Sequence, residues 1–260
     1  MSGTLVSISR FPIKGLTEDR LDAVRMSAGI GIPHDRKYAL ALVDTVFDEA
    51  HPAPLPKTKF AVLARYEKVA RLRTRYREAD RLIEIGVDDA PLVSGSLEEA
   101  EGRRRIAEAV TGFMGETLDG PLRLVGAREH RFTDSSVRSP VFMEAVSIIN
   151  LASVRDLEAR IGRRVDYRRF RANFLIDGIP TWAEFDWLER DFAIGDIGLK
   201  GLIRIRRCPA TEVDPDTAER DIRVPLELKD HFGHSELGIY ASVLSDGVLR
   251  PGAAVSGPAA

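Results

Sequence analysis

Short segments in which apolar and polar residues alternate recur along the whole chain. This two-residue period is typical of half-buried β-strands, because successive side chains point to opposite faces of a sheet. The strands that the pattern predicts cover residues 5–9, 37–43, 72–75, 82–86, 170–176, 192–194, 199–206 and 239–244. So many short strands with so few helices predict a mixed α+β, β-rich fold of barrel type.

Three segments carry the signals of helices. Residues 96–114 begin with the capping-box spacing of Ser96 and Glu99 and continue with a helical apolar face. Residues 151–161 repeat that face and are followed by Gly162, a residue that favours helix ends. A short helix is expected to begin at Pro225, because proline is well tolerated in a first turn.

The charge balance limits the partners of the chain. Among 260 residues, 38 Lys+Arg stand against 40 Asp+Glu, which gives a net charge of −2. This balance predicts neither a nucleic-acid partner nor binding to an anionic membrane. Arg10 and Lys14 precede any long apolar run, so we expect no signal peptide, no membrane anchor and a cytoplasmic location.

The chain has one cysteine, Cys208, at the end of a predicted strand. Pro209 ends that strand because proline lacks a backbone donor. The neighbouring Arg206 and Arg207 would favour the thiolate, the form that attacks electrophiles and binds soft metals. For an isolated cysteine, an inert buried thiol is the commoner case. A single cysteine also excludes an intrachain disulfide and a four-cysteine iron–sulfur cluster within these residues.

The residues around Cys208 resemble a family signature. Arg-Cys followed by Thr211, Val-Asp-Pro at 213–215 and Asp-Thr at 216–217 is similar to the motif of the MOSC domain family, the molybdenum cofactor sulfurase C-terminal family. Further resemblances follow in the family's order: Phe11-Pro12-Ile13-Lys14, Gly31 to Arg36, Asp134-Ser135-Ser136, and Phe170-Arg171-Ala172-Asn173. Together these matches span nearly the whole chain, and the layout is similar to that of the amidoxime-reducing component proteins.

The resemblance implies an arrangement of domains. A MOSC-type β-barrel would occupy residues 128–256, preceded by a smaller, barrel-like MOSC N-terminal domain at 1–127 and accompanied by a few peripheral helices. Residues 257–260 are rich in Gly, Pro and Ala and are expected to form a disordered tail.

The resemblance also implies a molybdenum cofactor site. Cofactor-binding roles fall on Lys14, Arg36, Ser135, Arg171, Asn173 and Thr211. Cys208 would be the ligand of molybdenum, a metal that favours soft sulfur, and would also count as catalytic. Asp214 would be a catalytic acid near substrate or metal, although Asp-Pro also favours turns and the two interpretations are equally supported. Without the resemblance, Lys14, Arg36 and Arg171 would be interpreted as surface or salt-bridged groups.

Three functions remain open from the sequence. The first is a molybdenum oxidoreductase that reduces N-hydroxylated or N-oxide-type small molecules. Since the chain shows no cluster or flavin motif, its electrons would come from a separate reductase or iron–sulfur protein. The second is a carrier that holds the cofactor or sulfur at Cys208 without turnover, and the third is a β-barrel scaffold without cofactor.

Two further groups of residues receive no role in the site. Lys57 and Lys59 follow a proline-rich loop and are expected to be solvated charges. His231 and His234 have a spacing that could bind zinc, but Gly233 interrupts the helix and no second ligand pair is present, so we expect no zinc there.

Overall fold

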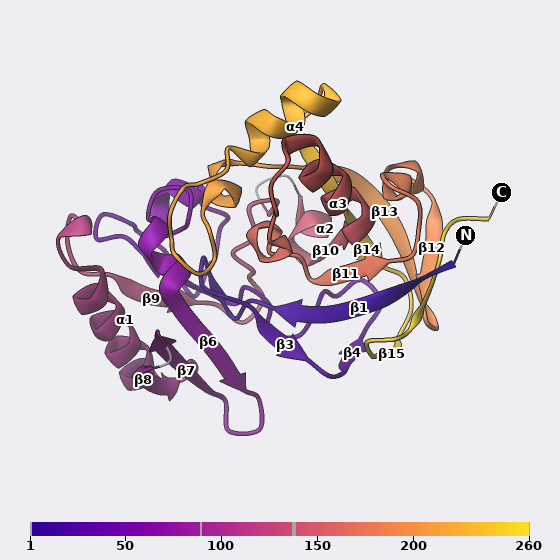
Figure 1. Ribbon diagram of the computed structural model, residues 1–260. Helices are drawn as coiled ribbons and strands as arrows, with labels where there is room; N and C mark the ends of the chain where they lie inside the picture. The colour runs from indigo at the N-terminus through magenta and orange to yellow at the C-terminus, as the bar shows by residue number, and fades with distance from the viewer. Residues whose placement is uncertain (1, 89, 137–138, 260) are drawn as a thin grey trace.

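A closed seven-stranded β-barrel forms the larger part of the molecule (Figure 1). The computed structural model describes residues 2–88, 90–136 and 139–259. Around the barrel the strands follow the order β11, β10, β14, β13, β12, β16 and β1, and the pairing of β1 with β11 closes it. Their bounds are β1 Ser2–Arg10, β10 Val146–Asn150, β11 Phe174–Asp177, β12 Asp191–Ile194, β13 Ile197–Arg206, β14 Glu236–Val243 and β16 Ala254–Ser256. The predicted mixed α+β, β-rich class is confirmed.

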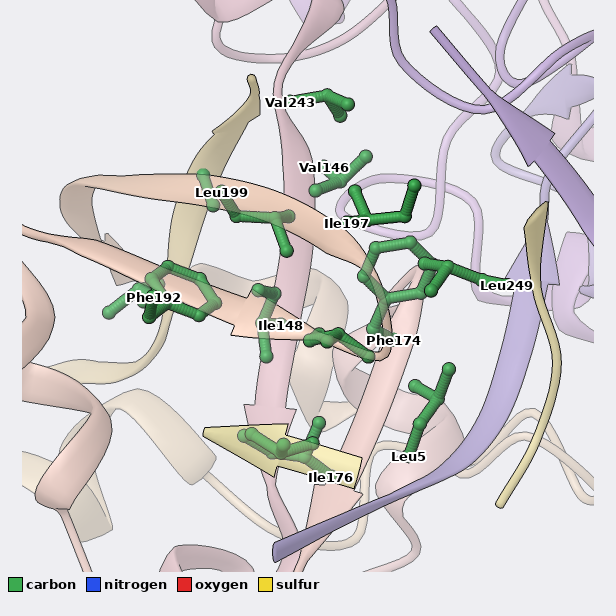
Figure 2. Packing of buried hydrophobic residues seen from close by; sticks show 14 of the residues in the cluster. Leu5, Val146, Ile148, Phe174, Ile176, Phe192, Ile197, Leu199, Val243 and Leu249 are labelled. Atoms are coloured by element: carbon green, nitrogen blue, oxygen red, sulfur yellow. The ribbon is translucent and has the colours of Figure 1, made fainter. Parts of the chain in front are cut away.

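Inward-facing apolar side chains fill the barrel. Figure 2 shows Leu5, Ile148, Phe174, Ile176 and other members of this core. These four side chains are fully buried, since alternation along each strand places every second residue inside. The pair β10–β11 is parallel, and the crossover between these strands is helix α3 (Leu151–Ile161).

A second group of small sheets packs beside the barrel (Figure 1). One sheet contains β2 (Ile13–Lys14), β5 (Tyr38–Ala41) and β9 (Arg123–Gly126), and another contains β6 (Leu72–Arg77), β7 (Leu82–Val87) and β8 (Ala90–Ser96). Helix α1 (Ala100–Met114) lies against β8 and β9. The remaining strands are β3 (Asp19–Leu21), which pairs with β1, and the pair β4 (Val24–Met26) and β15 (Gly247–Leu249). The N-terminal strand β1 thus belongs to the barrel sheet, and the division at residue 127 stays a prediction.

The predicted helices occur, with one difference in extent. Helix α1 begins at Ala100 rather than at residue 96, because residues 90–96 form the third strand of a sheet. Ser96 still accepts hydrogen bonds, at 3.2 and 3.3 Å, from the backbone N–H groups of the two glutamates before the helix. Helix α3 ends at Gly162 as predicted. The other two helices are α2 (Pro140–Glu144) and α4 (Val224–Phe232).

The strand predicted from residue 170 begins later. Residues Tyr167–Phe170 form a 3₁₀ helix, η4, and Arg171 takes a left-handed conformation with φ of 53° before β11 starts at Phe174. The other 3₁₀ helices are η1 (Lys57–Lys59), η2 (Glu67–Arg71), η3 (Gly115–Thr117), η5 (Ala183–Trp187) and η6 (Pro209–Glu212). This turn matters because it carries Arg171, which lines the cavity described below.

The helices and the C-terminal end add two observations. In the part of the chain that the structure describes, no helix has both the length and the apolar character needed to cross a membrane. Residues 257–259 have no regular structure, and the Cα of Gly257 faces the indole of Trp187. The last residue of the expected tail, Ala260, lies outside the described residues.

Candidate functional site

A cavity of about 240 Å³ lies where the barrel meets the smaller sheets. Six of the residues singled out from the sequence line it: Lys14, Arg36, Arg171, Asn173, Cys208 and Thr211. They come from β2, the turn before β5, the turn before β11 and the segment after β13, so only the tertiary fold brings them together. Ser135 and Asp214 do not line the cavity.

Cys208 lies two residues beyond the strand that was predicted to end at it. Strand β13 ends at Arg206, and the half-buried Cys208 precedes the 3₁₀ helix η6. Thr211 fixes this turn, because both its backbone N–H and its hydroxyl donate to the carbonyl oxygen of Cys208 at 2.9 Å. The two bonds therefore fix the backbone turn that carries Cys208 at the cavity wall.

Lys57 lines the same cavity as Cys208, which the sequence did not indicate. Its ammonium group lies 3.7 Å from Asp134, and the electrostatic influence of Cys208 also reaches it. Burial alone would lower the pKa of Lys57, but Cys208 and Asp134 outweigh burial and raise it. The prediction that Lys57 is only a solvated charge is therefore wrong, whereas Lys59 is a surface group paired with Asp44 at 3.0 Å.

Asp134 connects this pair to Lys14. The carboxylate of Asp134 accepts a hydrogen bond from the Lys14 ammonium group, which also donates to the carbonyl of Phe132 at 2.9 Å. Burial lowers the pKa of Lys14 against the opposing effect of Asp134. Asp134 itself has a lowered pKa, because the nearby lysines outweigh the effect of burial. At neutral pH the carboxylate of Asp134 is thus ionised.

Arg36 and Arg171 share one aromatic ring. Their guanidinium carbons lie 4.6 and 4.4 Å from the centroid of the Phe11 ring. Arg36 also pairs with Asp35 and donates to the carbonyl of Arg171 at 3.0 Å. Arg171 donates to the carbonyl of Leu16. Burial and then the adjacent Arg36 lower the pKa of Arg171. Both arginines are thus preorganised on a rigid aromatic support.

Arg207, the residue before Cys208, is a buried arginine. Only 8% of it is exposed, and it donates to the carbonyls of Leu237 at 2.9 Å and Phe170 at 3.1 Å. Burial lowers its pKa. Within the described ranges, the hydrogen-bond partners of Arg171 and Arg207 are all backbone carbonyls, and neither arginine has a carboxylate within ion-pair distance. Buried cations without an anion are costly, which indicates a site for an anionic ligand.

The polar side chains of Asn173 and Ser135 are already engaged within the protein. Asn173 accepts from the backbone N–H and hydroxyl of Ser147 at 3.0 and 2.8 Å and donates to the carbonyl of Ser9 at 3.1 Å. It therefore joins β1 to β10 while it lines the cavity. Ser135 donates to the carbonyl of Phe142 at 2.9 Å and lies within hydrogen-bonding reach of Tyr240, another lining residue.

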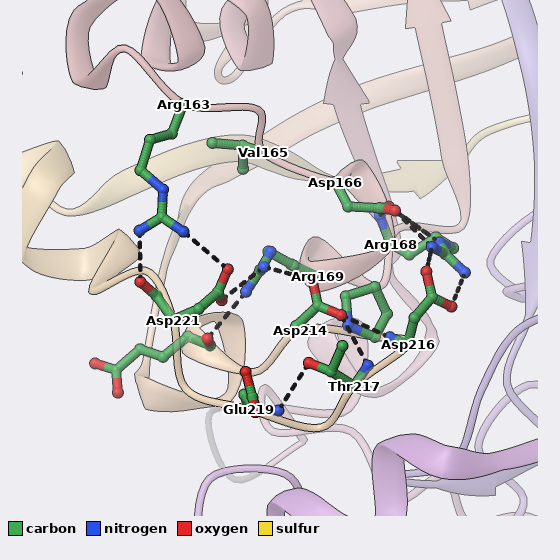
Figure 3. A network of polar contacts seen from close by, with 12 residues as sticks. Arg163, Val165, Asp166, Arg168, Arg169, Asp214, Asp216, Thr217, Glu219 and Asp221 are labelled. Atoms are coloured by element: carbon green, nitrogen blue, oxygen red, sulfur yellow. Dashed lines mark hydrogen bonds and ion pairs between the residues drawn. The ribbon is translucent and has the colours of Figure 1, made fainter.

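Asp214 lies in a network of arginines and acids beside the cavity (Figure 3). Its carboxylate pairs with Arg169 at 2.9 Å and accepts from the backbone N–H groups of Asp216 and Thr217, both at 2.9 Å. Arg169 is nearly fully buried and also pairs with Asp221 at 2.7 Å. The carboxylate of Asp214 thus shapes the loop after Cys208, which is the turn role that Asp-Pro favours.

The charged lining of the cavity is strongly unbalanced. Among the described residues that line it there are seven cations and a single carboxylate, that of Asp134. The cations are Lys14, Arg36, Lys57, Arg169, Arg171, Arg206 and Arg207. Lys57, Arg169 and Tyr240 received no role from the sequence, since each belongs to a local pattern that is common on protein surfaces or in strands. Only their convergence on one cavity identifies them.

Comparisons with known proteins identify a family for this chain. The model of the family described as "MOSC domain" matches residues 127–256, which is half of the chain. Mouse mitochondrial amidoxime-reducing component 1 is 42% identical over 80 residues, a match covering 31% of this chain and 23% of the relative. Rat mitochondrial amidoxime reducing component 2 is 34% identical over 119 residues, which is 41% of this chain and 35% of the relative.

A third relative matches over a longer stretch. The molybdenum cofactor sulfurase of Caenorhabditis briggsae is 26% identical over 247 residues, covering 91% of this chain and 33% of the relative. The matched part of each of these relatives is therefore about a third of its length or less. Among solved structures, the YUAD protein from Bacillus subtilis overlaps with a TM-score of 0.43 at 12% identity, over 98% of this chain and 94% of that one. Because the family model matches half of this sequence, the chain belongs to the MOSC domain family.

Proposed function

We propose that the protein binds the molybdenum cofactor in this cavity and reduces N-hydroxylated or N-oxide-type small molecules. The observation that carries the proposal is the pair Arg171 and Arg207, whose described hydrogen-bond partners are backbone carbonyls, next to the thiol of Cys208. The names of the relatives, amidoxime-reducing component and molybdenum cofactor sulfurase, support the same chemistry.

The residues present fit such a cofactor. Its terminal phosphate is an anion that arginines recognise through charge-assisted, bidentate hydrogen bonds, which Arg36, Arg171 and Arg207 could provide. Lys14 and Asn173 would contact the polar edge of the pterin. The soft sulfur of Cys208 suits molybdenum as a protein ligand. When bound, the cofactor supplies a metal that changes its oxidation state by two electrons.

The chain's own residues would orient the reacting groups. The ammonium group of Lys57, which lines the same cavity, would attract negative charge on the sulfur of Cys208. In the overall reaction the N–O bond of the substrate breaks, two electrons and two protons are taken up, and the reduced nitrogen compound and water leave. The single cysteine cannot hold a four-cysteine cluster, so the electrons would come from a separate reductase or iron–sulfur protein.

The decisive experiment measures molybdenum and pterin in protein purified without oxygen from a host that makes the cofactor. We expect about one molybdenum and one pterin per chain. Cys208→Ser should keep the thermal unfolding temperature, since serine is close in size, and lose metal binding or turnover. If the wild-type protein contained neither molybdenum nor pterin under these conditions, the proposal would be wrong.

The source of electrons is tested separately. The loaded protein should be inactive with a nicotinamide donor alone and active once a reductase or an artificial reductant is added. Sustained turnover with the nicotinamide alone would contradict the proposed need for a redox partner.

A carrier function is the second candidate. The match to a molybdenum cofactor sulfurase over most of this chain favours it, since a carrier needs the reactive thiol of Cys208 but no turnover of its own. Protein that is loaded with cofactor and stays inactive with every reductant, yet passes cofactor or sulfur to a second apo-enzyme, would support the carrier. The cytoplasmic location stays a prediction, which cell fractionation would test.

A further inference from the structure

Arg206 is a lining residue of the cavity that the proposed cofactor site leaves unused. It is exposed to solvent and also lines the cavity, so it lies where the cavity opens. Within the described part of the chain its guanidinium group has no hydrogen bond, ion pair or aromatic partner. Its register partner on β14, Glu236, lies instead 3.6 Å from His234.

The other cations of the lining are already accounted for. Lys14 and Lys57 face Asp134, Arg36 pairs with Asp35, and Arg169 pairs with two aspartates. Arg171 is partly buried and Arg207 is deeply buried, and both would bind the cofactor phosphate. Arg206 thus remains as a free positive charge at the entrance, two residues before Cys208.

Resting on the proposed function, we propose that Arg206 binds an anionic group of the substrate. The protein would then select N-hydroxylated small molecules that carry a carboxylate over uncharged ones of the same shape. A guanidinium group binds a carboxylate through two parallel hydrogen bonds, which gives both attraction and orientation. The reducible N–O group would be presented toward Cys208 while the carboxylate stays at the entrance.

An acidic redox protein is a weaker candidate for the partner of Arg206. Such a protein needs a broad basic surface, but two arginines on segments near the cavity are paired with acids of this chain. Arg220 lies near Glu67 and Glu212, at 3.5 and 3.4 Å, and Arg65 lies 3.3 Å from Asp119. One unpaired arginine fits a small anion better than a protein surface.

The test compares two substrates that share a reacting group, benzamidoxime and 4-carboxybenzamidoxime. The cofactor-loaded wild-type protein should show a higher kcat/KM for the carboxylated compound. Arg206→Gln should lower this preference roughly tenfold, since one charge-assisted contact is lost, and Arg206→Glu should reverse it. Added salt should reduce the wild-type preference, because the contact lies near solvent.

Arg204→Gln is the matched control. Arg204 is exposed on the same strand, two residues earlier, and stacks on Phe185 at 4.3 Å outside the cavity lining. Its replacement should leave the ratio of the two kcat/KM values unchanged. An unchanged ratio in Arg206→Gln, or a wild-type preference for the uncharged substrate, would overturn the proposal.

A binding measurement separates this inference from the proposed reaction. Calorimetric titration of the loaded protein with benzoate, which cannot be reduced, should show binding that Arg206→Gln weakens and Arg204→Gln does not. If neither amidoxime is reduced but benzoate behaves in this way, the proposed reaction fails and the anion site at Arg206 stands. If Arg206→Gln slows both substrates equally, and only with a protein electron donor, Arg206 docks the donor and the inference is wrong.

Discussion

Arg169 and Asp214 form an ion pair of 2.9 Å that joins the turn before Arg171 to the loop after Cys208. Only 2% of the Arg169 side chain is exposed, against 24% of the Asp214 side chain. The pair therefore fixes the relative positions of a proposed cofactor anchor and the proposed metal ligand. It also gives Asp214 a structural task besides the catalytic one that the resemblance implied.

Removing this carboxylate should destabilise the protein. Asp214→Ala leaves Arg169 with Asp221 and one carbonyl and frees two backbone N–H groups, so we expect a loss of about 1–3 kcal/mol. The loss is measured as the difference in the free energy of unfolding in urea between the wild-type and Asp214→Ala apo-proteins. Glu219→Ala, in the same loop but exposed, is the control and should change stability by less than about 0.5 kcal/mol. An Asp214→Ala protein with full stability would refute the structural task.

Acid should weaken the same contact. Burial raises the pKa of Asp214, but the backbone N–H groups of Thr217 and Asp216 together with Arg169 outweigh burial and lower it below 3.8. A depressed carboxyl pKa contributes stability above the unfolded pKa, and this contribution is lost as the pH falls through the folded pKa. The stability difference between wild type and Asp214→Ala should therefore shrink below about pH 4. A difference that stays constant down to pH 2 would contradict this.

The arginine pair on Phe11 should control cofactor retention. Arg36→Ala and Arg171→Ala should each weaken pterin binding roughly 10- to 100-fold, since a charge-assisted contact contributes about 1.5–3 kcal/mol. Replacing either arginine by lysine should weaken binding less than alanine does, because lysine keeps the positive charge but loses the planar, bidentate hydrogen bonding of the guanidinium group. Pterin content at limiting cofactor supply is the measurement, and the exposed Arg25→Ala on β4 is the control.

The two replacements should also be non-additive. Arg36 donates to the carbonyl of Arg171 and both contact one ring, so the double variant should lose less than the sum of the single losses. Full pterin content in both single variants would show that these positions do not hold the cofactor.

His130 should make the protein sensitive to mild acid. It is buried against Phe132 and Phe47, with ring centroids 4.8 and 5.6 Å away. Burial, and then Lys37 and Lys14, lower its pKa below 6.5. Below pH 6.5 the unfolded chain binds a proton that the folded state excludes, so stability falls as the pH drops toward the folded pKa. His130→Gln should lose less stability than wild type between pH 7 and pH 5, whereas the exposed His51→Gln should match wild type.

The contribution of Glu184 to stability should have the opposite pH dependence. Its carboxyl group is fully buried and accepts from Asn150 at 3.0 Å and Ser153 at 2.9 Å. Burial raises its pKa, so its stabilising effect is present below 4.5 and is lost as the pH rises through the folded pKa. Glu184→Gln should therefore raise the unfolding temperature at pH 8 more than at pH 4. The exposed Glu189→Gln should show no such difference between the two pH values.

Much of the architecture follows from local patterns. Alternation predicted the strands around Leu72, Leu82, Leu199 and Ile239, and the cap-and-glycine pattern predicted helix α3 with its end at Gly162. The start of β11 was missed because Phe170 and Arg171 fit a strand pattern, yet the chain there turns through a 3₁₀ helix and a left-handed residue. Turn geometry of this kind depends on contacts with distant segments.

The sequence by itself determined that the chain is β-rich, that Cys208 lies between a strand and a proline, and that two arginines precede this thiol. These features depend on neighbours along the chain, so periodicity and turn chemistry reveal them. Only the tertiary structure decided that Lys57 and Cys208 line one cavity, that Asn173 is bonded to Ser147, and that Arg207 has no carboxylate partner among the described residues. Each of these contacts joins residues far apart in the sequence, and burial, which sets the cost of an unpaired charge, exists only once the barrel has closed.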